Sequence, residues 1–336
     1  MKLAIFKPHR MPLSIANYID NVLENFPEYV KFYFFFTKEE IRNLRDEVDI
    51  YWFPNCAGGS FPSVRLLTLI EDEKVVVTLH GAAPFTVSPR IYYPTVKSLI
   101  KGELYKWMHF MKWQIYKDRI SKIITVSNYA KEEICSKLLL PKDKVCPIYH
   151  GVNLNIFNEY GSMLGQGDYF LHVSQYQPKK NVDRIIEAYI KIPEPKAKFV
   201  LVLPGYKKEI KNENIVLIKA PKTHGELAVL YRNAIAFVFP SLHESFGMSI
   251  LEAMACGCPV ITSNISACAE IAGNAALLVN PYSIGEISNA MRRLMEDSQL
   301  RKDLSERGIK RAKKFTWKES AMNHLKVFEG ILKGIK

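Results

Sequence analysis

The sequence lacks several features that would settle its class at once. No run of about 18 apolar residues occurs within its 336 residues, so we expect no membrane-spanning helix. The apolar start at Met1 is too short and too soon interrupted for a signal peptide. None of the six cysteines forms a Cys-x-x-Cys pair, which gives no support to a zinc or thioredoxin-like site. We therefore expect buried, unpaired thiols and a reducing, cytoplasmic compartment.

Acidic residues are also few relative to basic ones. The chain has 34 Asp and Glu against 46 Lys and Arg, a formal net charge of +12. Hydrophobic residues make up 48% and charged residues 24%, a globular composition that excludes disorder, and the length favours two domains. The excess charge points to nucleic acid, a phosphorylated substrate or an acidic membrane surface as a partner. Composition alone equally allows a soluble protein with a basic surface.

Two segments carry this positive charge. Residues 90–122 hold eight basic residues against two acidic ones, and residues 301–336 hold eleven against four. The rest of the chain is therefore close to neutral. Both segments have apolar residues at helical spacing, so we expect the charge to lie on folded helices.

Short β-rich runs alternate with longer helical patterns along the whole chain. The runs are almost continuously apolar, which is typical of parallel strands covered on both faces. We predict strands over residues 3–6, 31–36, 49–53, 75–79, 122–126, 145–149, 170–173, 199–203, 215–218, 236–239, 260–262 and 276–279. The predicted fold class is α/β, with two doubly wound, Rossmann-like domains.

The alternation breaks at residues 161–167, where three glycines predict a linker. This places one domain at residues 1–160 and a second at 168–316. A last helix, residues 317–336, is expected to pack back on the first domain. Because ligands bind at the carboxyl ends of parallel strands, we expect the site in a cleft between the domains.

The richest motif spans residues 239–260 and predicts a strand, a loop, a helix, a turn and a second strand. The helix begins near a glycine, so its first N–H groups would lack partners and could bind a phosphate. The residues that supply this end of the helix are Phe246, Gly247, Met248 and Ser249.

Two glutamates accompany this helix. Glu244 lies in the loop and Glu252 lies two turns into the helix, so both can line one ligand. A carboxylate accepts hydrogen bonds from neighbouring hydroxyls, and ribose and hexose both offer such pairs. The alternative is a surface glutamate with a buried, ion-paired one. For Glu252 the apolar helix weakens that alternative, because a lone buried carboxylate is unfavourable.

This motif resembles the Glu-x7-Glu signature of the retaining family-4 glycosyltransferases, which have the two-domain GT-B fold. The resemblance continues through residues 261–281 and 313–317, so it covers essentially the whole second domain. It is thinner in the first domain, where it rests on residues 49–55, 77–81, 125–129 and 149–152. In this family the first domain binds the acceptor and the second binds the nucleotide sugar.

The resemblance implies roles for individual residues. Glu244 would contact the donor hexose, and Glu252 would hold the nucleotide ribose. Lys180 would bind the diphosphate, because its ammonium group, a point cation, stabilises the charge on the leaving group. Many relatives have Gly-Arg where this chain has Ser174-Gln175, so Gln175 would meet the phosphate without supplying a charge.

His80 ends a predicted strand, where a histidine fits a structural role as well as a functional one. The resemblance implies that His80 contacts the donor sugar. No Asp-x-Asp occurs, so we expect no metal and no other cofactor, with Lys180 and the helix N-terminus in the metal's place. The implied mechanism is front-face, with the departing diphosphate oxygen taking the acceptor proton.

The basic segment of the first domain predicts one long helix over residues 96–118. We expect one set of apolar residues at helical spacing to face the core: Ile100, Leu104, Met108, Met111 and Ile115. A second set would then be left for an acidic membrane or the acceptor: Lys106, Phe110, Lys112 and Trp113. The pattern also fits a solvated basic face with its aromatics packed inside. No recognition motif accompanies the charge, so we expect no nucleic-acid partner.

Together these features predict a retaining, metal-independent hexosyltransferase that uses a nucleotide sugar. Residues 49–55 resemble mannosyltransferase members, so we expect α-mannose from GDP-mannose to reach a lipid-linked or glycan acceptor at the inner face of a membrane. The alternative donor is UDP-glucose or another UDP-sugar. The rival classes are a nucleotide-sugar epimerase and an inactive, basic membrane-surface protein.

Overall fold

The structure is a computed structural model that describes residues 1–8, 10–44, 47–70, 74–92, 95–161, 169–220 and 222–334. The chain divides into two compact units. The first unit contains Met1–Gly151 and Trp317–Lys336, and the second contains Val152–Thr316.

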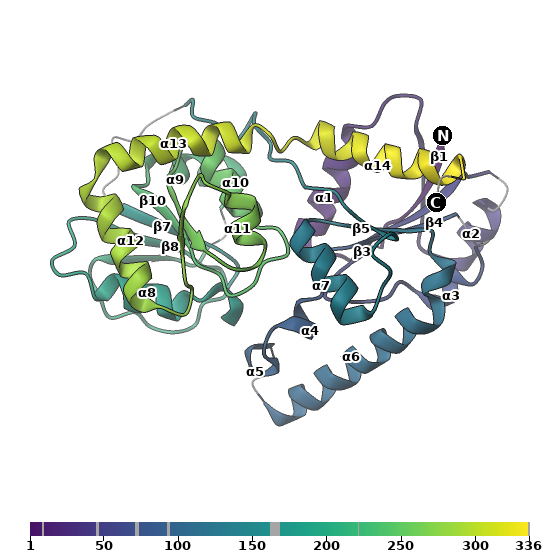
Figure 1. Cartoon of the computed structure of the whole chain (residues 1–336), viewed down its shortest axis with the longest axis horizontal. Helices are drawn as coiled ribbons and strands as arrows, with labels where there is room; N and C mark the ends of the chain where they lie inside the picture. The colour runs from purple at the N-terminus through teal and green to yellow at the C-terminus, as the bar shows by residue number, and fades with distance from the viewer. Residues whose placement is uncertain are drawn as a thin grey trace. The chain divides into compact units, whose positions relative to one another are not determined.

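The first unit is built on a six-stranded parallel sheet with the order β2-β1-β3-β4-β5-β6. Figure 1 labels β1, β3, β4 and β5 of this sheet. Its strands are β1 (Lys2–Phe6), β2 (Lys31–Phe35), β3 (Ile50–Cys56), β4 (Val75–Leu79), β5 (Lys122–Thr125) and β6 (Val145–Pro147). β2 lies on one side of β1, and the later strands, from β3 to β6, follow one another on the other side. Side chains alternate along each strand, so the two faces of the sheet need separate cover.

Helices cover both faces of this sheet. Trp52 of β3 meets α1 (Leu13–Glu24) and α14 (Trp317–Leu332) on one face. The neighbouring β3 residues point to the opposite face and join the core there with residues of five helices. These helices are α2 (Lys38–Leu44), α3 (Val64–Leu67), α4 (Ala83–Thr86), α6 (Val96–Tyr116) and α7 (Asn128–Leu138). Two short elements connect along the chain to α6, namely α5 (Pro89–Tyr92) before it and η1 (Lys117–Arg119) after it.

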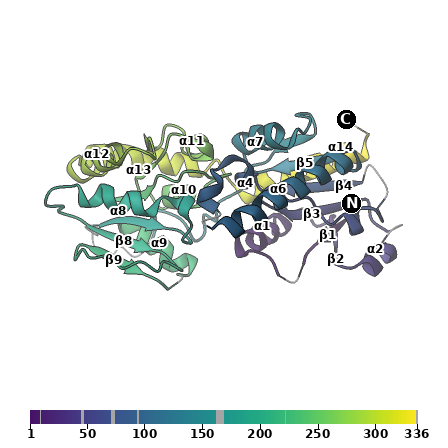
Figure 2. The same cartoon turned by 90° about the horizontal axis from the view of Figure 1, so that it is seen from below.

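The second unit has the same plan, with the strand order β12-β11-β10-β7-β8-β9. Figure 2 labels two strands of this sheet, β8 and β9. Its strands are β7 (Tyr169–Val173), β8 (Lys198–Val202), β9 (Ile215–Ile218), β10 (Ala236–Phe239), β11 (Val260–Ser263) and β12 (Leu277–Val279). Its helices are η2 (Pro178–Lys180), α8 (Val182–Ile190), α9 (His224–Asn233), α10 (Met248–Ala255), α11 (Ser266–Ala272), α12 (Ile284–Glu296) and α13 (Ser298–Ala312). Within the described residues α8 packs with α12, and α10 packs with α9 and α13.

The predicted fold class is confirmed, and each predicted strand overlaps a strand of the structure. The boundary between units differs from the predicted one, because the second unit begins at Val152. Residues before position 161 pack with that unit: Val152 N–H donates to the Phe315 carbonyl at 3.0 Å, and Arg232 Nη1 donates to the Asn158 carbonyl at 3.2 Å. Most of the predicted linker, residues 162–167, lies outside the described residues.

The predicted orientation of α6 is wrong. Trp113 is fully buried and Phe110 packs against the core of the first unit, whereas Ile100, Leu104 and Ile115 are exposed. Trp113 is fixed by its Nε1–H, which donates to the Gly59 carbonyl at 3.0 Å. The helix carries apolar residues on two opposite sides, and the larger aromatic side faces inward. Among the described residues, neither α6 nor any other helix is long and apolar enough to cross a membrane.

This orientation gives a direct stability test. Trp113→Ala should lower the free energy of unfolding by about 3–5 kcal/mol, because it opens a cavity and leaves a buried carbonyl without its donor. Trp107→Ala is the matched control on the same helix and should change it by less than about 0.5 kcal/mol, since Trp107 is exposed. Urea unfolding followed by circular dichroism measures both. Equal losses would show that the assigned faces of α6 are wrong.

Candidate active site

The predicted donor-site residues of the second unit lie around the two central strands of its sheet. β7 and β10 are hydrogen-bonded neighbours and run in parallel, so the segments that follow them leave the same edge. β8 and β9 lie on the β7 side of this pair, and β11 and β12 lie on the β10 side. This is a topological switch point, the place where doubly wound sheets bind ligands.

Asn181 ties together the segments that leave this edge. It has a left-handed backbone, with φ of 63°, and stands between η2 and α8. Its buried side-chain Nδ2 donates to the Pro240 carbonyl at 2.9 Å and to the Pro281 carbonyl at 2.7 Å. Leu242 N–H adds a backbone bond to the Lys179 carbonyl at 2.8 Å. The loop that carries Lys180 is therefore fixed against the loop that carries Glu244.

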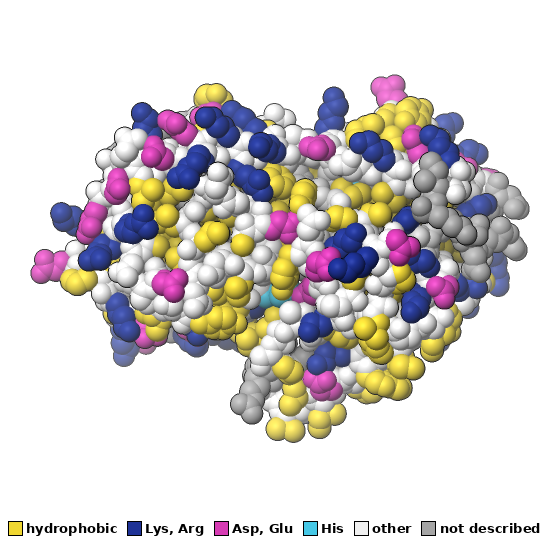
Figure 3. All heavy atoms as spheres, in the orientation of Figure 1, with side chains coloured by type: hydrophobic (Ala, Val, Ile, Leu, Met, Phe, Trp, Pro, Cys, Tyr) yellow, Lys and Arg dark blue, Asp and Glu magenta, His cyan; other side chains and the backbone are white. Residues whose placement is uncertain are grey.

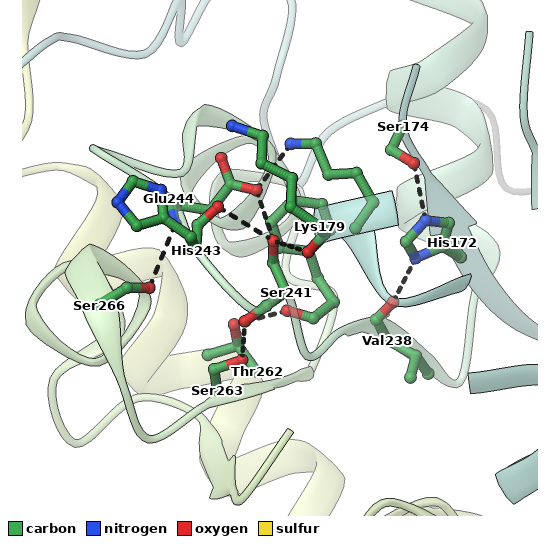
Figure 4. A network of polar contacts seen from close by, with 12 residues as sticks. His172, Ser174, Lys179, Val238, Ser241, His243, Glu244, Thr262, Ser263 and Ser266 are labelled. Atoms are coloured by element: carbon green, nitrogen blue, oxygen red, sulfur yellow. Dashed lines mark hydrogen bonds and ion pairs between the residues drawn. The ribbon is translucent and has the colours of Figure 1, made fainter. Parts of the chain in front are cut away.

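Glu244 and Lys180 form an ion pair at this point. Lys180 Nζ lies 2.7 Å from Glu244 Oε1, and both side chains are largely buried. Lys180 Nζ also lies 4.9 Å from the centroid of the Phe239 ring, within cation–π range. Figure 4 shows Ser241 beneath Glu244, and the Ser241 hydroxyl donates to the same Oε1 at 2.7 Å.

The neighbouring lysines and Ser241 determine whether Glu244 is ionised. Burial alone would raise the pKa of Glu244, but the positive charges of Lys180 and Lys179 and the hydrogen bonds from Lys180 and Ser241 outweigh it. The net result is a pKa of about 2. The group is therefore ionised at neutral pH and can only accept hydrogen bonds, as a partner for sugar hydroxyls must.

The N-terminus of α10 follows directly after Glu244. Gly247 caps it with φ of +106°, and no side chain forms a hydrogen bond as a cap. Met248 and Ser249 occupy the first two helical positions, so their N–H groups have no intrahelical acceptor. Phe246 is buried, with its ring 6.2 Å from that of Phe315. This end of the helix has the dipole and the donors that a phosphate requires.

Glu252 lies on the first turns of the same helix and is partly buried. Burial raises the pKa of Glu252 to about 7, and a hydrogen bond from the Tyr231 hydroxyl at 3.4 Å opposes this only in part. Glu252 thus faces a different environment from Glu244, which has a lysine beside it. A diol that donates two hydrogen bonds would stabilise the ionised form of Glu252.

Gln175 lies in the segment after β7, beside Gly205, and is exposed. The preceding Ser174 is buried, and its hydroxyl donates to His172 Nε2 at 2.9 Å, because His172 Nδ1–H donates to the Val238 carbonyl. Figure 4 shows this second group of contacts on the strands themselves. His172 therefore holds β7 and β10 together, in keeping with a structural role, and burial lowers its pKa to about 4.

His80 belongs to the first unit, where it directly follows β4. Burial lowers the pKa of His80 to about 4, although a hydrogen bond to the Pro54 carbonyl opposes the shift. That bond, 2.8 Å long, uses Nε2–H as the donor, because a carbonyl only accepts. The ring is then neutral with its lone pair on Nδ1, a state suited to accept a hydrogen bond from a hydroxyl.

A chain of buried hydrogen bonds holds Tyr18 in place, and the ring of Tyr18 packs against His80. Trp52 Nε1–H donates to Thr78 Oγ1 at 2.9 Å, and Thr78 Oγ1 lies 3.2 Å from the Tyr18 hydroxyl. Tyr18 donates to His324 Nε2 at 2.6 Å, since His324 Nδ1–H donates to the Ser320 carbonyl. The Tyr18 ring packs edge-on against the His80 ring, with centroids 4.8 Å apart. Through this chain, α14 contributes to the position of His80.

The structure thus brings Lys180, Glu244 and the start of α10 together within the second unit, with Glu252 further along the helix. His80 lies in the other unit, and the four residues predicted for a membrane or acceptor lie on α6: Lys106, Phe110, Lys112 and Trp113. No group of three metal-ligating side chains comes together among the residues that the structure describes.

Three further residues shape the site, and the sequence predicted no role for them. Ser241 supports Glu244, Tyr231 donates to Glu252, and Asn181 joins the loops. Ser241 and Asn181 occupy loop positions next to the predicted strand and helix ends, which is a signal in the sequence. Tyr231 lies on α9, and nothing in its sequence context indicates its contact with α10.

Comparison with known proteins matches both parts of the chain. Residues 163–311 match the family described as glycosyl transferases group 1, and residues 17–156 match glycosyltransferase family 4. The O-antigen chain mannosyltransferase B of Escherichia coli is 27% identical over 282 residues, which cover 76% of this chain and 70% of that protein. An uncharacterised glycosyltransferase of Methanocaldococcus jannaschii is 31% identical over 264 residues, which cover 76% and 68%.

Solved structures agree on the fold. Sucrose-phosphate synthase of Thermosynechococcus elongatus superposes with a TM-score of 0.73 at 15% identity, over 99% of both chains. The Anabaena protein HepE, solved in complex with UDP and glucose, superposes with a TM-score of 0.70 at 14% identity, over 98% of this chain and 100% of that one. At these identities the likeness concerns the fold, and it confirms the predicted GT-B class.

The raised pKa of Glu252 predicts a pH dependence of stability. Between its ordinary value of 4.5 and about 7, the folded chain holds a proton that the unfolded chain has lost. The Glu252 contribution to the free energy of unfolding therefore falls as the pH rises through this window. Glu252→Gln removes the contribution, so the variant should gain stability relative to the natural chain from pH 4.5 to 7 and keep the gain above. Denaturant unfolding across this range measures the difference, and two parallel curves would contradict it.

Proposed function

Because the chain belongs to glycosyltransferase family 4, we propose that it transfers a hexose from a nucleotide diphosphate sugar, with retention of configuration, to a glycan or lipid-linked acceptor. The observation that carries this proposal is the Lys180–Glu244 pair beside the N-terminus of α10. One cation, one ionised carboxylate and a set of helix N–H groups form a site with affinity for both a diphosphate and sugar hydroxyls.

In this proposal the leaving diphosphate binds Lys180 and the N–H groups of Met248 and Ser249. Lys180 then leaves Glu244, whose Oε1 becomes available for the hydroxyls of the hexose. Glu252 accepts from the nucleotide ribose, and Gln175 donates its amide hydrogens to a phosphate oxygen. His80, held neutral, accepts from a sugar hydroxyl.

The chemical step follows from these contacts. The bond between C1 of the hexose and the diphosphate oxygen breaks, and the acceptor oxygen forms its bond to C1 on the same face of the ring. The departing diphosphate oxygen takes the acceptor proton, and Lys180 with the end of α10 stabilises the charge that develops. No metal is required in this scheme, because the lysine and the helix supply the positive charge.

We propose GDP-mannose as the donor. The proposal is supported by the similarity to the Escherichia coli O-antigen chain mannosyltransferase and by a second O-antigen chain mannosyltransferase, from Salmonella typhimurium, which is 28% identical over 235 residues. A UDP-sugar is the alternative donor. We further propose that transfer takes place at the cytoplasmic surface of a membrane, where a lipid-linked acceptor would lie.

The role of Glu244 predicts a kinetic effect. Glu244→Gln should reduce kcat by about 100-fold or more, because the neutral amide replaces the ionised acceptor beside the reacting sugar. Glu296→Gln is the matched control, since it removes one exposed carboxylate of the same unit, and should leave kcat unchanged. The assay measures GDP release from GDP-mannose in the presence of acceptor extracts. Equal rates for the natural chain and Glu244→Gln would remove Glu244 from the site.

The donor and the reaction class have a separate test. Acceptor-dependent nucleotide release should be supported by GDP-mannose, at most weakly by UDP-glucose, and should persist in EDTA. Faster turnover of UDP-glucose would replace the proposed donor. Release that never depends on acceptor would favour an epimerase or hydrolase, and complete loss in EDTA would contradict the metal-free scheme.

A further inference from the structure

Helix α6 has a continuous row of exposed apolar side chains, which we call the apolar stripe. Single exposed apolar residues are ordinary on a folded chain, but a contiguous row of them is uncommon and marks an interaction surface. The exposed fractions are Val96 75%, Ile100 65%, Leu104 61%, Trp107 62%, Met108 38%, Met111 37% and Ile115 62%. Figure 3 shows hydrophobic side chains gathered along the lower edge of the first unit, over α6.

The stripe is one face of the helix. At about 100° per residue, its seven members fall within a sector of about 120°. With a rise of about 1.5 Å per residue, it extends over about 28 Å. This shape is a long, narrow apolar surface rather than scattered exposed residues.

The opposite face of α6 is anchored to the first unit, so the stripe cannot turn inward. His109 Nδ1 accepts a hydrogen bond from Phe61 N–H at 2.8 Å, and Trp113 donates to the Gly59 carbonyl at 3.0 Å. At the edge of the stripe, in line with Val96, Gln114 Nε2 donates to the Leu138 carbonyl at 2.7 Å. These contacts and the burial of Trp113 fix the rotation of the helix about its axis.

Positive charge accompanies the stripe. Lys97 falls within the sector of the stripe, and Lys101 and Lys112 lie along one edge of it, all three within about 80° of Leu104. Glu103, the one acidic residue of α6, is paired with Lys106 at 2.5 Å, so these two charges offset each other. The surface that remains combines apolar side chains with cationic ones and has no acidic excess.

We propose that α6 lies along the surface of an anionic lipid bilayer, with the apolar stripe inserted at the headgroup boundary and Lys97, Lys101 and Lys112 among acidic headgroups. An amphipathic helix with lysines beside an apolar face binds such surfaces in the plane of the membrane. A second copy of the chain fits less well, because stripe-to-stripe contact would bring like charges together. The biological sense of this docking rests on the proposed function, since a lipid-linked acceptor would lie in that bilayer.

Tryptophan fluorescence provides a direct test. The four tryptophans are Trp52, Trp107, Trp113 and Trp317, and Trp107 alone among them is exposed. Vesicles of phosphatidylcholine with phosphatidylglycerol should shift the emission to shorter wavelength and protect Trp107 from iodide. Vesicles of phosphatidylcholine alone should do so at least about tenfold less effectively, because the lysines gain nothing there. No shift with either vesicle, or equal shifts with both, would overturn the proposal.

Variants separate the two components of the surface. Leu104→Ser/Trp107→Ser should reduce co-sedimentation with anionic vesicles by about tenfold or more, through lost apolar insertion. Lys97→Gln/Lys101→Gln should reduce it by about tenfold and should weaken its salt dependence. All four positions are exposed, so circular dichroism should show an unchanged fold.

The controls place matched changes in the second unit. Ile190→Ser/Tyr282→Ser removes two exposed apolar side chains, and Lys302→Gln/Lys310→Gln removes two exposed charges from α13. Both should bind vesicles as the natural chain does, and losses equal to those of the α6 variants would overturn the proposal. Light scattering without lipid completes the test: a dimer that Leu104→Ser/Trp107→Ser converts to monomer would assign the stripe to a second copy.

Failure of docking and failure of the proposed function are distinguishable. Glu252→Gln should bind vesicles normally while losing transfer, because Glu252 belongs to the second unit. The α6 variants should still bind GDP. Loss of vesicle binding in Glu252→Gln would overturn the assignment to α6, whereas normal vesicle binding by a chain without transferase activity would leave the docking proposal standing and reject the function.

Discussion

The ion pair between Lys180 and Glu244 is the interaction on which the rest of the site depends. Two charges at a largely buried position are unfavourable unless each is held by the other and by further hydrogen bonds. Ser241 provides one such bond, and Asn181 fixes the two loops so that the pair can form. Because both loops follow neighbouring strands, the sheet places them side by side, and these side-chain bonds complete the geometry.

This constraint explains how two glutamates eight residues apart in the sequence differ in character. Glu244 has a cation beside it, and its pKa falls to about 2, whereas burial raises the pKa of Glu252 to about 7. In the proposed reaction the diphosphate replaces Glu244 as the partner of Lys180, and the sugar hydroxyls replace Lys180 as partners of Glu244. A site that holds its own charges paired in this way remains stable when empty and is already arranged for a charged ligand.

The sequence predicted the strands and the fold class well, because short apolar runs in alternation with helices have few other solutions. The strand end before Glu244 predicted the loop in which this residue lies, whereas Lys180 was assigned through the family resemblance. The faces of α6 could not be predicted, since Trp113 and Leu104 lie on opposite sides and both sides have helical apolar spacing. Only the packing of Trp113 against the Gly59 region decides between them. Short helices such as α2 (Lys38–Leu44) and α11 (Ser266–Ala272) were missed, because seven residues give too little periodicity.

A crystal structure of the protein with GDP tests the central claim most directly. The account predicts that Lys180 Nζ leaves Glu244 Oε1 and contacts the diphosphate, that the phosphates approach the N–H groups of Met248 and Ser249, and that the ribose hydroxyls donate to Glu252. A nucleotide bound elsewhere on the chain, with the Lys180–Glu244 pair intact, would contradict the account.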